Sequence, residues 1–236
     1  MAQITGDQQV QSEVLEGLAT AVNHRHWFAE LALPYLGSNP IEIGSGLGDY
    51  ALEWAPHTAR FTATEADPDR LVGLKERLAG HTDIEVRQML LPSEVDGAYT
   101  AAVSYNVLEH IEDDRRALQS MGRLVRPGGA VIIIVPAFPF AMSPVDIATG
   151  HVRRYTIRSL ARAMQRADLR VERINYTNAL GLIGYYMATS VLRLTPKEGA
   201  MVKFYDKLVL PATKAVEQRV RPPFGQSVFA VARRPR

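Results

Sequence analysis

The sequence predicts an α/β protein with an open, mostly parallel sheet and helices on both faces, and three observations lead to this fold class. Short apolar runs alternate with helix-compatible segments over residues 39–136. A glycine-rich turn, from Gly44 to Gly48, joins the first apolar run to a helix. An acid, Glu65, ends the second run, roughly twenty residues beyond that turn. Strands joined through helices run parallel, so we expect helices to cover both faces of the sheet.

Composition excludes several kinds of function before any motif is considered. A chain of 236 residues with 47% hydrophobic content can bury the core of one domain and an elaboration of it. A net charge of +2 indicates no general surface for polyanions, so no nucleic-acid partner is expected. The lack of cysteine excludes disulfides and thiolate metal sites and fits a cytoplasmic protein. The polar residues 1–13 lack the apolar stretch of a signal peptide.

Residues 1–38 are expected to form a helical cap in front of the sheet. Apolar residues recur at helical spacing over residues 14–36. The polar run at residues 23–26 is expected to break this region into two helices. Trp27 and Phe28 are expected to belong to the core rather than to contact a ligand.

The sheet is expected to contain seven strands. They are placed at residues 41–43, 60–65, 84–89, 101–104, 130–136, 169–176 and 227–233. Helices are expected at residues 50–54, 68–79 and 115–125. The pair of glycines in residues 126–129 predicts a turn before the fifth strand. The α/β core then covers residues 39–176, a helical insert covers 177–225, and residues 226–236 supply the last strand and a basic tail.

The spacing of the glycines bears on which ligand the turn could hold. A turn of this kind needs positive φ, and glycine lets the backbone approach a ligand closely. The dinucleotide fingerprint is Gly-x-Gly-x-x-Gly, whereas here the third glycine comes one residue early. Acids also bracket the loop, at Glu42 and Asp49, and they suit a ligand with an amino group and a sulfonium better than a pyrophosphate. The alternative is a turn that only connects a strand to a helix.

Residues Glu42 to Gly48, followed by Glu65, resemble the glycine loop and acidic post-loop of class I S-adenosylmethionine-dependent methyltransferases, in their small-molecule branch. A helix, the sequence Arg-Pro-Gly-Gly at 126–129 and an apolar strand follow in the order typical of the same family. The resemblance implies a Rossmann-like sheet whose last two strands are antiparallel neighbours. It also implies S-adenosylmethionine as cofactor and S-adenosylhomocysteine as product.

The resemblance assigns the cofactor contacts residue by residue. They fall on Glu42, Gly44, Ser45, Gly46, Gly48, Tyr50, Glu65, Ala66, Leu90, Leu91, Asn106 and Leu108. Glu65 is expected to accept hydrogen bonds from both ribose hydroxyls. The alternatives are an ordinary surface acid at this strand end, or a role for Asp67, which precedes Pro68 as the N-cap of the next helix. Gln88 and Met89 stand where the family often has an acid for the adenine amine, so apolar packing and backbone are expected to hold the adenine.

The fourth strand runs into Asn106-Val107-Leu108-Glu109-His110, a group of metal-ligand types at the end of a strand. The segment resembles the Glu-x-x-Glu-His metal-binding segment of quinone O-methyltransferases, with Asn106 in place of the first acid. The resemblance implies that Glu109 and His110 could hold Mg²⁺. The alternative is that Glu109 caps a helix and that His110 is a packed, hydrogen-bonded histidine.

A second polar segment, residues 146–155, follows the fifth strand, where substrate-binding segments usually fall. Its pattern, Asp…Gly-His-x-Arg-Arg-Tyr, resembles bacterial methyltransferases associated with sugar and glycolipid pathways. The resemblance extends through residues 178–181 to residues 222–227, so it covers nearly the whole chain.

The two polar segments together supply the candidate catalytic residues. An alcohol acceptor needs a group that removes its proton, and His110 or His151 is expected to be that base. Asp146 and Tyr155 are expected to hydrogen-bond a polyhydroxylated acceptor. The alternative is an ion pair between Asp146 and one of the two arginines before Tyr155 that closes the loop.

The insert is the least typical part of the chain. Residues 178–194 are strongly apolar and aromatic, yet fall short of the ~20 clean apolar residues of a membrane span. A second insert helix, at residues 201–220, is expected to be interrupted at Pro211. The insert is expected to be a lid, with a homodimer interface or contact with a lipid-like acceptor as alternatives.

These observations lead to one functional hypothesis and three alternatives. The hypothesis is a cytoplasmic O-methyltransferase that acts on a hydroxyl of a sugar or glycan-like small molecule, and more narrowly an actinobacterial enzyme for a mannose-type saccharide. A quinone, phenolic or lipid-like acceptor is the first alternative, supported by the apolar insert. An N-methyltransferase of nucleic acid or protein is disfavoured because the Asn/Asp-Pro-Pro-Tyr type of amide clamp is absent after the fourth strand. The last alternative is a non-catalytic protein that binds S-adenosylmethionine.

Overall fold

The computed structural model describes residues 6–7, 10, 20–187 and 204–236. Three parts of the sequence predictions lie outside these residues. They are residues 14–19 of the N-terminal cap, residues 188–194 of the apolar insert segment, and residues 201–203 at the expected start of the second insert helix.

A seven-stranded sheet forms the centre of the molecule, in the order β3-β2-β1-β4-β5-β7-β6. The strands are β1 (Ile41–Ile43), β2 (Phe61–Glu65), β3 (Ile84–Gln88), β4 (Tyr99–Tyr105), β5 (Val125–Pro136), β6 (Arg170–Thr177) and β7 (Ser227–Arg233). The first five run parallel, and β7 lies antiparallel between β5 and β6. The predicted fold class, including the antiparallel pair formed by the last two strands, is confirmed.

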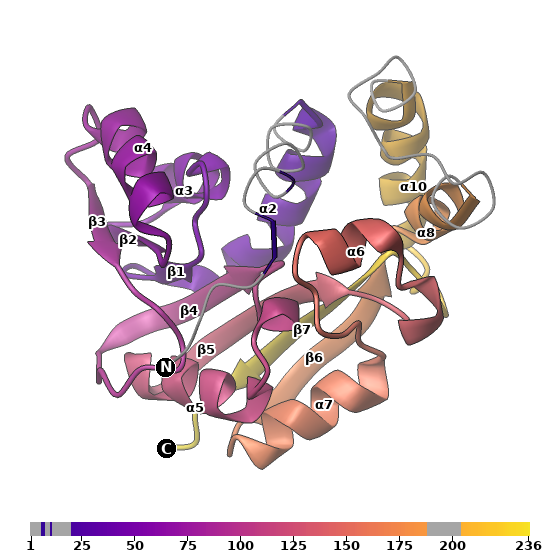
Figure 1. The fold of residues 1–236 in the computed structure, drawn as a ribbon. Coiled ribbons are helices and arrows are strands. Elements are labelled where there is room, and N and C mark those ends of the chain that lie inside the picture. The colour runs from indigo at the N-terminus through magenta and orange to yellow at the C-terminus, as the bar shows by residue number, and fades with distance from the viewer. Residues whose placement is uncertain (1–5, 8–9, 11–19, 188–203) are drawn as a thin grey trace.

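Helices cover both faces of the sheet, as Figure 1 shows. One face carries α2 (Val22–Leu36), α3 (Asp49–Trp54), α4 (Pro68–Leu78) and α10 (Leu210–Glu217), and the other carries α5 (Asp114–Leu124) and α7 (Ile157–Arg166). Alternate side chains of the central strands point to the two faces and build two cores. Trp54 is fully buried in the core under α2 and α3, and Met121 lies in the core under α5 and α7.

Shorter elements fill the connections. They are the 3₁₀ turns Ala55–His57, Leu108–His110 and Pro139–Ala141, the helices α6 (Pro144–Ala148) and α8 (Ala179–Tyr186), and the π-helical turn Tyr205–Val209. Among the described residues, no helix is both long and apolar enough to cross a membrane.

The expected break is misplaced: Thr20 and Ala21 lie outside any helix, and α2 runs from Val22 through residues 23–26 without interruption. The carboxylate of Asp206 accepts hydrogen bonds from the backbone N–H groups of Asn23 (3.1 Å) and His24 (2.9 Å) at the start of this helix. A distant acid therefore supplies the N-terminal cap that the local sequence lacks. Trp27 and Phe28 are buried, as predicted.

The expected turn at residues 126–129 is not separate from the fifth strand, because β5 begins at Val125 and includes it. Tyr99 pairs with Val125 and Ala101 with Ala130, so the extra residues of β5 bulge out of register with β4. Gly128 takes a φ of 78° in this bulge. The glycines do mark a turn of the backbone, as predicted. Because β5 pairs with β4 both before and after this turn, the turn is a bulge within one strand.

The described part of the insert is tied to the ends of β6 and β7. Both carboxylate oxygens of Glu217 on α10 cap the start of α8, accepting from the N–H groups of Asn178 (3.0 Å) and Ala179 (2.8 Å). The Asn178 side chain donates to Gln226 Oε1 at 2.8 Å, just before β7. The expected interruption at Pro211 takes the form of the π-helical turn that precedes α10.

Candidate active site

The glycine loop lies at the carboxyl end of β1, where strand order reverses between β2 and β4. Gly44, Gly46 and Gly48 all have positive φ, of 74°, 54° and 81°. A Cβ added to Gly44 would lie 2.5 Å from Cγ2 of Val107. The loop therefore passes so close to the segment after β4 that only glycine fits at its first position.

Hydrogen bonds from Ser45 fix this loop to β2. The Ser45 N–H donates to the carbonyl oxygen of Thr64 at 2.7 Å, and the Thr64 N–H donates to Ser45 Oγ at 3.1 Å. The Ser45 hydroxyl in turn donates to Glu42 Oε2 at 2.7 Å. The loop is thus held by β1 and β2, with the Ser45 side chain turned toward these strands.

Glu65 is held beside the loop by backbone donors. Its Oε2 accepts from the Gly46 N–H at 2.9 Å, and its Oε1 accepts from the N–H groups of Ala66 (2.8 Å) and Asp67 (3.0 Å). A carboxylate has about four acceptor sites, so capacity remains for a ligand hydroxyl. Asp67 is the N-cap of α4, the role predicted for it from the following proline. The contact between Glu65 and a ribose stays a prediction.

Glu42 is a buried acid beneath the loop, 2% exposed. Burial raises the pKa of Glu42 to about 8; its hydrogen bond with Ser45 opposes the rise, and the neighbouring Glu65 and Asp49 add to it. Glu42 is therefore largely protonated at neutral pH. A cationic ligand group placed beside it would favour the ionised form, which suits the ammonium or sulfonium expected here.

The other expected cofactor residues form two groups. Tyr50 stacks on Trp54 with ring centroids 5.1 Å apart, and it forms an aromatic wall beside the loop. Ala66 is half-buried, whereas Asn106 and Leu90 are exposed. All three are therefore accessible to a ligand. Leu91 and Leu108 instead pack into the core on the α5 face.

Glu109, His110 and His151 come together after β4, with one ligand atom of each lying within 4.8 Å of the others. His151 comes from the loop after β5, and its Nε2 lies 3.9 Å from Glu109 Oε1. Glu109 is fully buried, and neither of its carboxylate oxygens has a hydrogen-bond partner among the described residues. Burial raises the pKa of Glu109 to about 7, opposed in part by His151. Burial, reinforced by His151, lowers the pKa of His110 to about 4.

This cluster could hold a metal, and it adds one donor to the two that the sequence indicated. Glu109 and His110 are two of the three donors, His151 is the third, and Asn106 is not among them. One carboxylate and two imidazoles favour a transition metal such as Zn²⁺ over Mg²⁺, which prefers oxygen ligands. The orphaned, buried carboxylate of Glu109 fits a bound cation.

Asp146 connects His151 to the rest of the loop. Its Oδ1 lies 2.8 Å from His151 Nδ1, and Arg154 Nη2 donates to both Asp146 oxygens, at 2.8 and 3.0 Å. Burial alone would raise the pKa of Asp146, but the bonds from His151, Arg154 and Ser143 outweigh burial and hold it well below its usual range. Asp146 is therefore both the orienting partner of a histidine and half of a structural ion pair.

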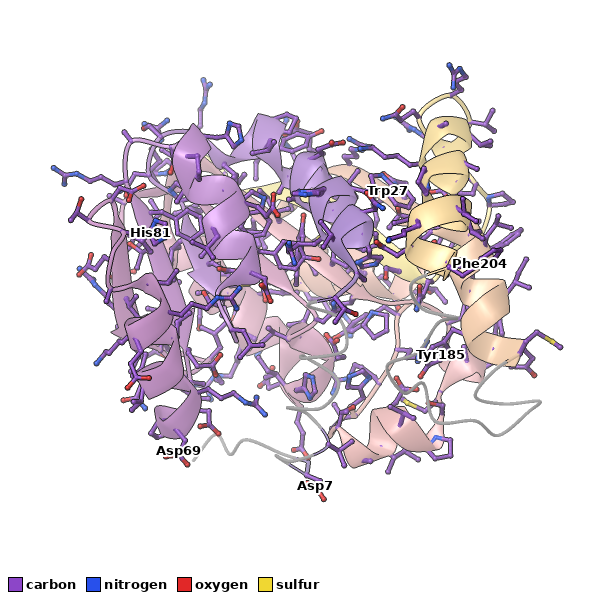
Figure 2. The ribbon with its side chains drawn as sticks, turned by 90° about the horizontal axis from the view of Figure 1, so that it is seen from above. Asp7, Trp27, Asp69, His81, Tyr185 and Phe204 are labelled. Atoms are coloured by element: carbon purple, nitrogen blue, oxygen red, sulfur yellow. The ribbon has the colours of Figure 1, made fainter. Side chains whose placement is uncertain are left out.

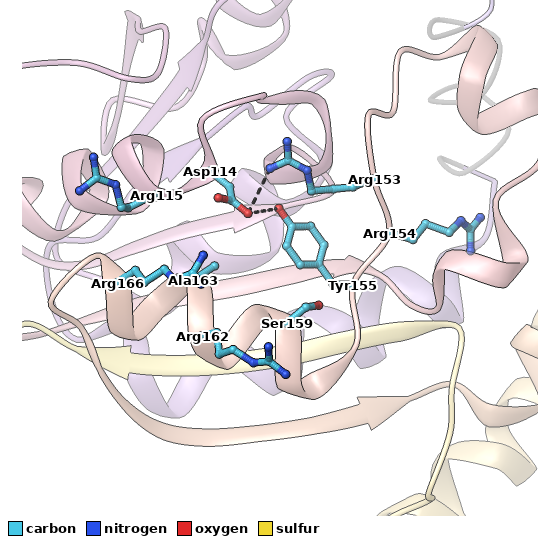
Figure 3. A pocket seen from close by; sticks show the side chains of 9 residues that line it. All are labelled: Asp114, Arg115, Arg153, Arg154, Tyr155, Ser159, Arg162, Ala163 and Arg166. Carbon is cyan, nitrogen blue, oxygen red and sulfur yellow. Dashed lines mark hydrogen bonds and ion pairs between the residues drawn. The ribbon is translucent and has the colours of Figure 1, made fainter.

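The structure does not bring Tyr155 together with the histidines and Asp146. Its hydroxyl donates to Asp114 Oδ2 at 3.0 Å, beside Arg153, whose Nη1 lies 3.1 Å from the same oxygen (Figure 3). The backbone of Tyr155 pairs with Ala137 in an extended conformation. Successive side chains of an extended chain point to opposite sides, so Tyr155 faces away from Arg154 and its partner Asp146.

Two residues of this site were missed from the sequence. Ser143 forms a capping box with Asp146 at the start of α6, a local pattern that the sequence does contain. Tyr185 projects from α8 toward the middle of the molecule (Figure 2). Its hydroxyl lies 2.7 Å from Ser143 Oγ and 3.2 Å from Asp146 Oδ2, and no local pattern predicts this contact across the insert.

Residues 20–174 match the family model described as "Methyltransferase domain". An uncharacterized methyltransferase of Mycobacterium sp. (strain JLS) is 29% identical over 97 residues, covering 41% of this chain and 38% of that protein. One from Mycobacterium leprae (strain TN) is 29% identical over 109 residues, covering 45% of this chain and 40% of that protein. The chain thus spans less than half the length of the curated relatives it matches.

Solved structures share the fold at low sequence identity. A chain of the complex between the Haloferax volcanii Trm112 methyltransferase activator and a methyltransferase has a TM-score of 0.65 at 14% identity, covering 99% of this chain and all of that one. Geranyl diphosphate C-methyltransferase from Streptomyces coelicolor A3(2) has a TM-score of 0.61 at 16% identity, with coverages of 87% and 76%. The [4+2]-cyclase SpnF reaches 0.61 at 17% identity, with coverages of 89% and 81%.

The raised pKa of Glu42 predicts how stability depends on pH. Glu42 keeps its proton up to about pH 8 in the folded state, but only up to about pH 4.5 in the unfolded chain. The stability that Glu42 contributes is therefore complete below pH 4.5 and is lost as the pH rises to 8. We expect the free energy of unfolding to fall because of this group by at most about 1.4 kcal/mol per pH unit. Glu42→Gln removes the titrating group. In urea unfolding, the free energy of unfolding of the variant should therefore rise relative to that of the wild type between pH 4.5 and 8. Parallel curves would contradict the assignment.

Gly44→Ala should distort the loop. The left-handed φ alone costs about 1–2 kcal/mol for a residue with a Cβ, and the stiff side chain of Val107 would have to move as well. We expect a lower midpoint in thermal unfolding and loss of ligand binding at the loop. Gly73→Ala on α4 is the matched control, because nothing lies within 4 Å of an added Cβ there. That control should be neutral or stabilising, and equal losses in the two variants would refute the argument from close approach.

Proposed function

The chain belongs to the methyltransferase domain family, and from this premise we propose that it transfers the methyl group of S-adenosylmethionine to a hydroxyl of a sugar or glycan-like small molecule. Membership of the family, together with the seven-stranded sheet, confirms the class I fold predicted from the sequence. The methyl donor, the acceptor and the oligomeric state of the whole protein belong to the proposal.

The single observation that carries the proposal is the meeting of two polar groups at one edge of the sheet. The glycine loop, with Glu42 below it and Glu65 beside it, follows β1 and β2. The cluster of Glu109, His110 and His151 follows β4 and β5. One group suits a cationic cofactor with a ribose, and the other suits an acceptor whose hydroxyl must lose a proton.

His151 is the better supported base of the two histidines. Its Nδ1 faces Asp146, which holds the ring and would stabilise the imidazolium, and its Nε2 is then available to accept the acceptor's proton. His110 has a lowered pKa, so it stays neutral and accepts a proton less readily. Methyl transfer is an in-line displacement that depends mainly on positioning, with the proton passing from the acceptor oxygen to His151. If a transition metal binds, Glu109, His110 and His151 would hold it; His151 would then be a ligand rather than the base, and the metal would instead lower the pKa of the acceptor hydroxyl.

The sugar class rests on the chemistry of the two polar segments. The imidazoles of His110 and His151 and the buried, unpartnered carboxylate of Glu109 offer several directional hydrogen bonds, which a polyhydroxylated acceptor can use. The resemblance of Asp146-x-x-x-Gly150-His151-x-Arg153-Arg154-Tyr155 to methyltransferases of sugar and glycolipid pathways supports the same class. Mycobacterial relatives are in keeping with an actinobacterial enzyme, and a mannose-type saccharide is the narrower proposal.

A lipid-like or phenolic acceptor is the second candidate, and one observation favours it. Leu180 and Ile183 on α8 are about half exposed, and Phe140 and Ile147 of the neighbouring loop and α6 are 64% and 68% exposed. Phe140 contacts Tyr186 of α8, so apolar side chains of the loop and of the helix lie together, and they would also suit a homodimer interface. The [4+2]-cyclase with the same fold is a reason to test methyl transfer itself rather than binding alone.

We also propose that the insert acts as a lid that completes the acceptor side. Tyr185 links α8 to Ser143 and Asp146 through its hydroxyl, and its ring lies 4.8 Å from the Arg154 guanidinium. The insert therefore touches the group that orients His151. Closing or displacing α8 would change how firmly Asp146 is held.

The first test is calorimetric titration of the protein with S-adenosylmethionine and S-adenosylhomocysteine. Transfer of labelled methyl to monosaccharides, disaccharides and phenols follows, with Zn²⁺, Mg²⁺ or a chelator in parallel. We expect cofactor binding and transfer to a saccharide. His151→Asn should keep cofactor binding and slow transfer by roughly 100- to 10,000-fold, the usual contribution of a general base.

The exposed His81 gives a matched control, and His81→Asn should behave as the wild type. Turnover of phenols only would move the function to the second candidate. Cofactor binding without any transfer would leave a non-catalytic binding protein, and absence of cofactor binding would refute the proposal.

Tyr185→Phe removes one hydroxyl from the network around Asp146. We expect kcat to fall roughly tenfold, the value of one hydrogen bond that positions a catalytic group, with the KM for the cofactor unchanged. Tyr186→Phe is the control, because that tyrosine is 38% exposed and its ring packs against Phe140 rather than against the residues around Asp146. Equal effects in the two variants, or a change in cofactor KM alone, would show that Tyr185 does not position His151.

A further inference from the structure

A hollow of about 390 Å³ lies between α5 and α7, on the face of the sheet opposite α2 and α3. Figure 3 shows the side chains that line it: Asp114, Arg115, Arg153, Arg154, Tyr155, Ser159, Arg162, Ala163 and Arg166. Five of these nine residues are arginines and one is an acid. The glycine loop and the cluster around Glu109 contribute no residue to it.

Three of the five arginines of this hollow lack an acidic partner among the described residues. Arg154 is engaged by Asp146, and Arg153 is paired with Asp114. Arg115, Arg162 and Arg166 have no acidic partner within 4.0 Å among the described residues. Three guanidinium charges therefore face one small volume, in a chain whose net charge is only +2.

Hydrogen bonds and an ion pair hold the side chains at the buried end of the hollow, around Tyr155. Asp114 Oδ2 accepts from the Tyr155 hydroxyl and is paired with Arg153, which holds both side chains in place. Tyr155 is 2% exposed, and Ala163 is buried at the base of α7. Arg162 and Arg166 stand four residues apart on one face of α7, so both reach the same opening.

We propose that this pocket binds a phosphoryl group, as a phosphomonoester or diphosphate carried by a small molecule or a lipid headgroup. The planar guanidinium donates two parallel hydrogen bonds that match the oxygens of a phosphate, and several arginines around one anion are the usual way to bind it. The volume exceeds that of inorganic phosphate, so there is room for part of an organic group. The hollow is open to solvent between the two helices, so an anionic group can enter it from outside.

The proposal stands apart from methyl transfer, although the two sites share a segment of chain. His151, Arg153 and Tyr155 belong to the same loop, and Arg154 contributes to the pocket wall while its charge is engaged by Asp146. Variants at Arg162 and Arg166 on α7 leave this loop intact. They therefore test the pocket without touching the residues proposed for catalysis.

The test is calorimetric titration of the full chain with inorganic pyrophosphate at low ionic strength, where charges are least screened. We expect binding that the double variant Arg162→Gln/Arg166→Gln weakens roughly tenfold or more, since charge-assisted hydrogen bonds to the anion are lost. Arg158→Gln is the matched control, one turn earlier on α7 and outside the pocket. It should bind as the wild type does, and S-adenosylmethionine binding should be the same in all three proteins.

Vesicles distinguish the two sources of the phosphoryl group. Sedimentation with phosphatidylglycerol vesicles but not with phosphatidylcholine vesicles, lost in the double variant, would indicate a lipid headgroup. Pyrophosphate binding without such sedimentation would indicate a soluble ligand. Equal weakening by Arg158→Gln, or no binding of pyrophosphate or anionic vesicles by the wild type, would overturn the proposal while leaving the methyltransferase assignment untouched.

Discussion

The reversal of strand order at β1 is the constraint on which the polar architecture of this protein depends. β2 lies on one side of β1 and β4 on the other, all parallel, so their carboxyl ends share one edge of the sheet. Glu65, the glycine loop and the segment up to His110 must therefore meet there, although they are far apart in sequence. The 2.5 Å approach that a Gly44 Cβ would make to Val107 shows how tightly this meeting is enforced.

Two buried carboxylates at this edge have opposite properties because of what surrounds them. Asp146 and Glu109 are both almost fully buried, and burial alone would raise both pKa values. Asp146 is surrounded by donors from Arg154, Ser143 and His151, so it stays ionised. Glu109 has no hydrogen-bond partner among the described side chains and titrates near neutrality. One acid thus fixes geometry, and the other keeps acceptor capacity for a cation or a hydroxyl, a division typical of active sites.

Sequence reasoning located what depends on local pattern. The last strand, β7, was predicted with its observed bounds because an apolar run stands between a polar segment and a basic tail. Glu109, His110 and His151 were all singled out, but their assembly into one cluster is tertiary and no spacing reveals it. The break before α2 was misplaced for the same reason, since the cap of this helix is the distant Asp206. Tyr185 was missed because its partner Asp146 belongs to another element.

The two adjacent arginines of the loop show how one extended segment can serve two sites. Tyr155 pairs with Ala137 as a strand would, so neighbouring side chains alternate between two sides of the chain. Arg154 turns inward, where the ion pair with Asp146 offsets the cost of burying its charge. Arg153 and Tyr155 turn to Asp114 and the arginine-lined hollow. Exchanging the roles of the two arginines would require reversing the pleat, so backbone geometry fixes which acid each guanidinium pairs with, although Arg154 also contributes to the wall of the hollow.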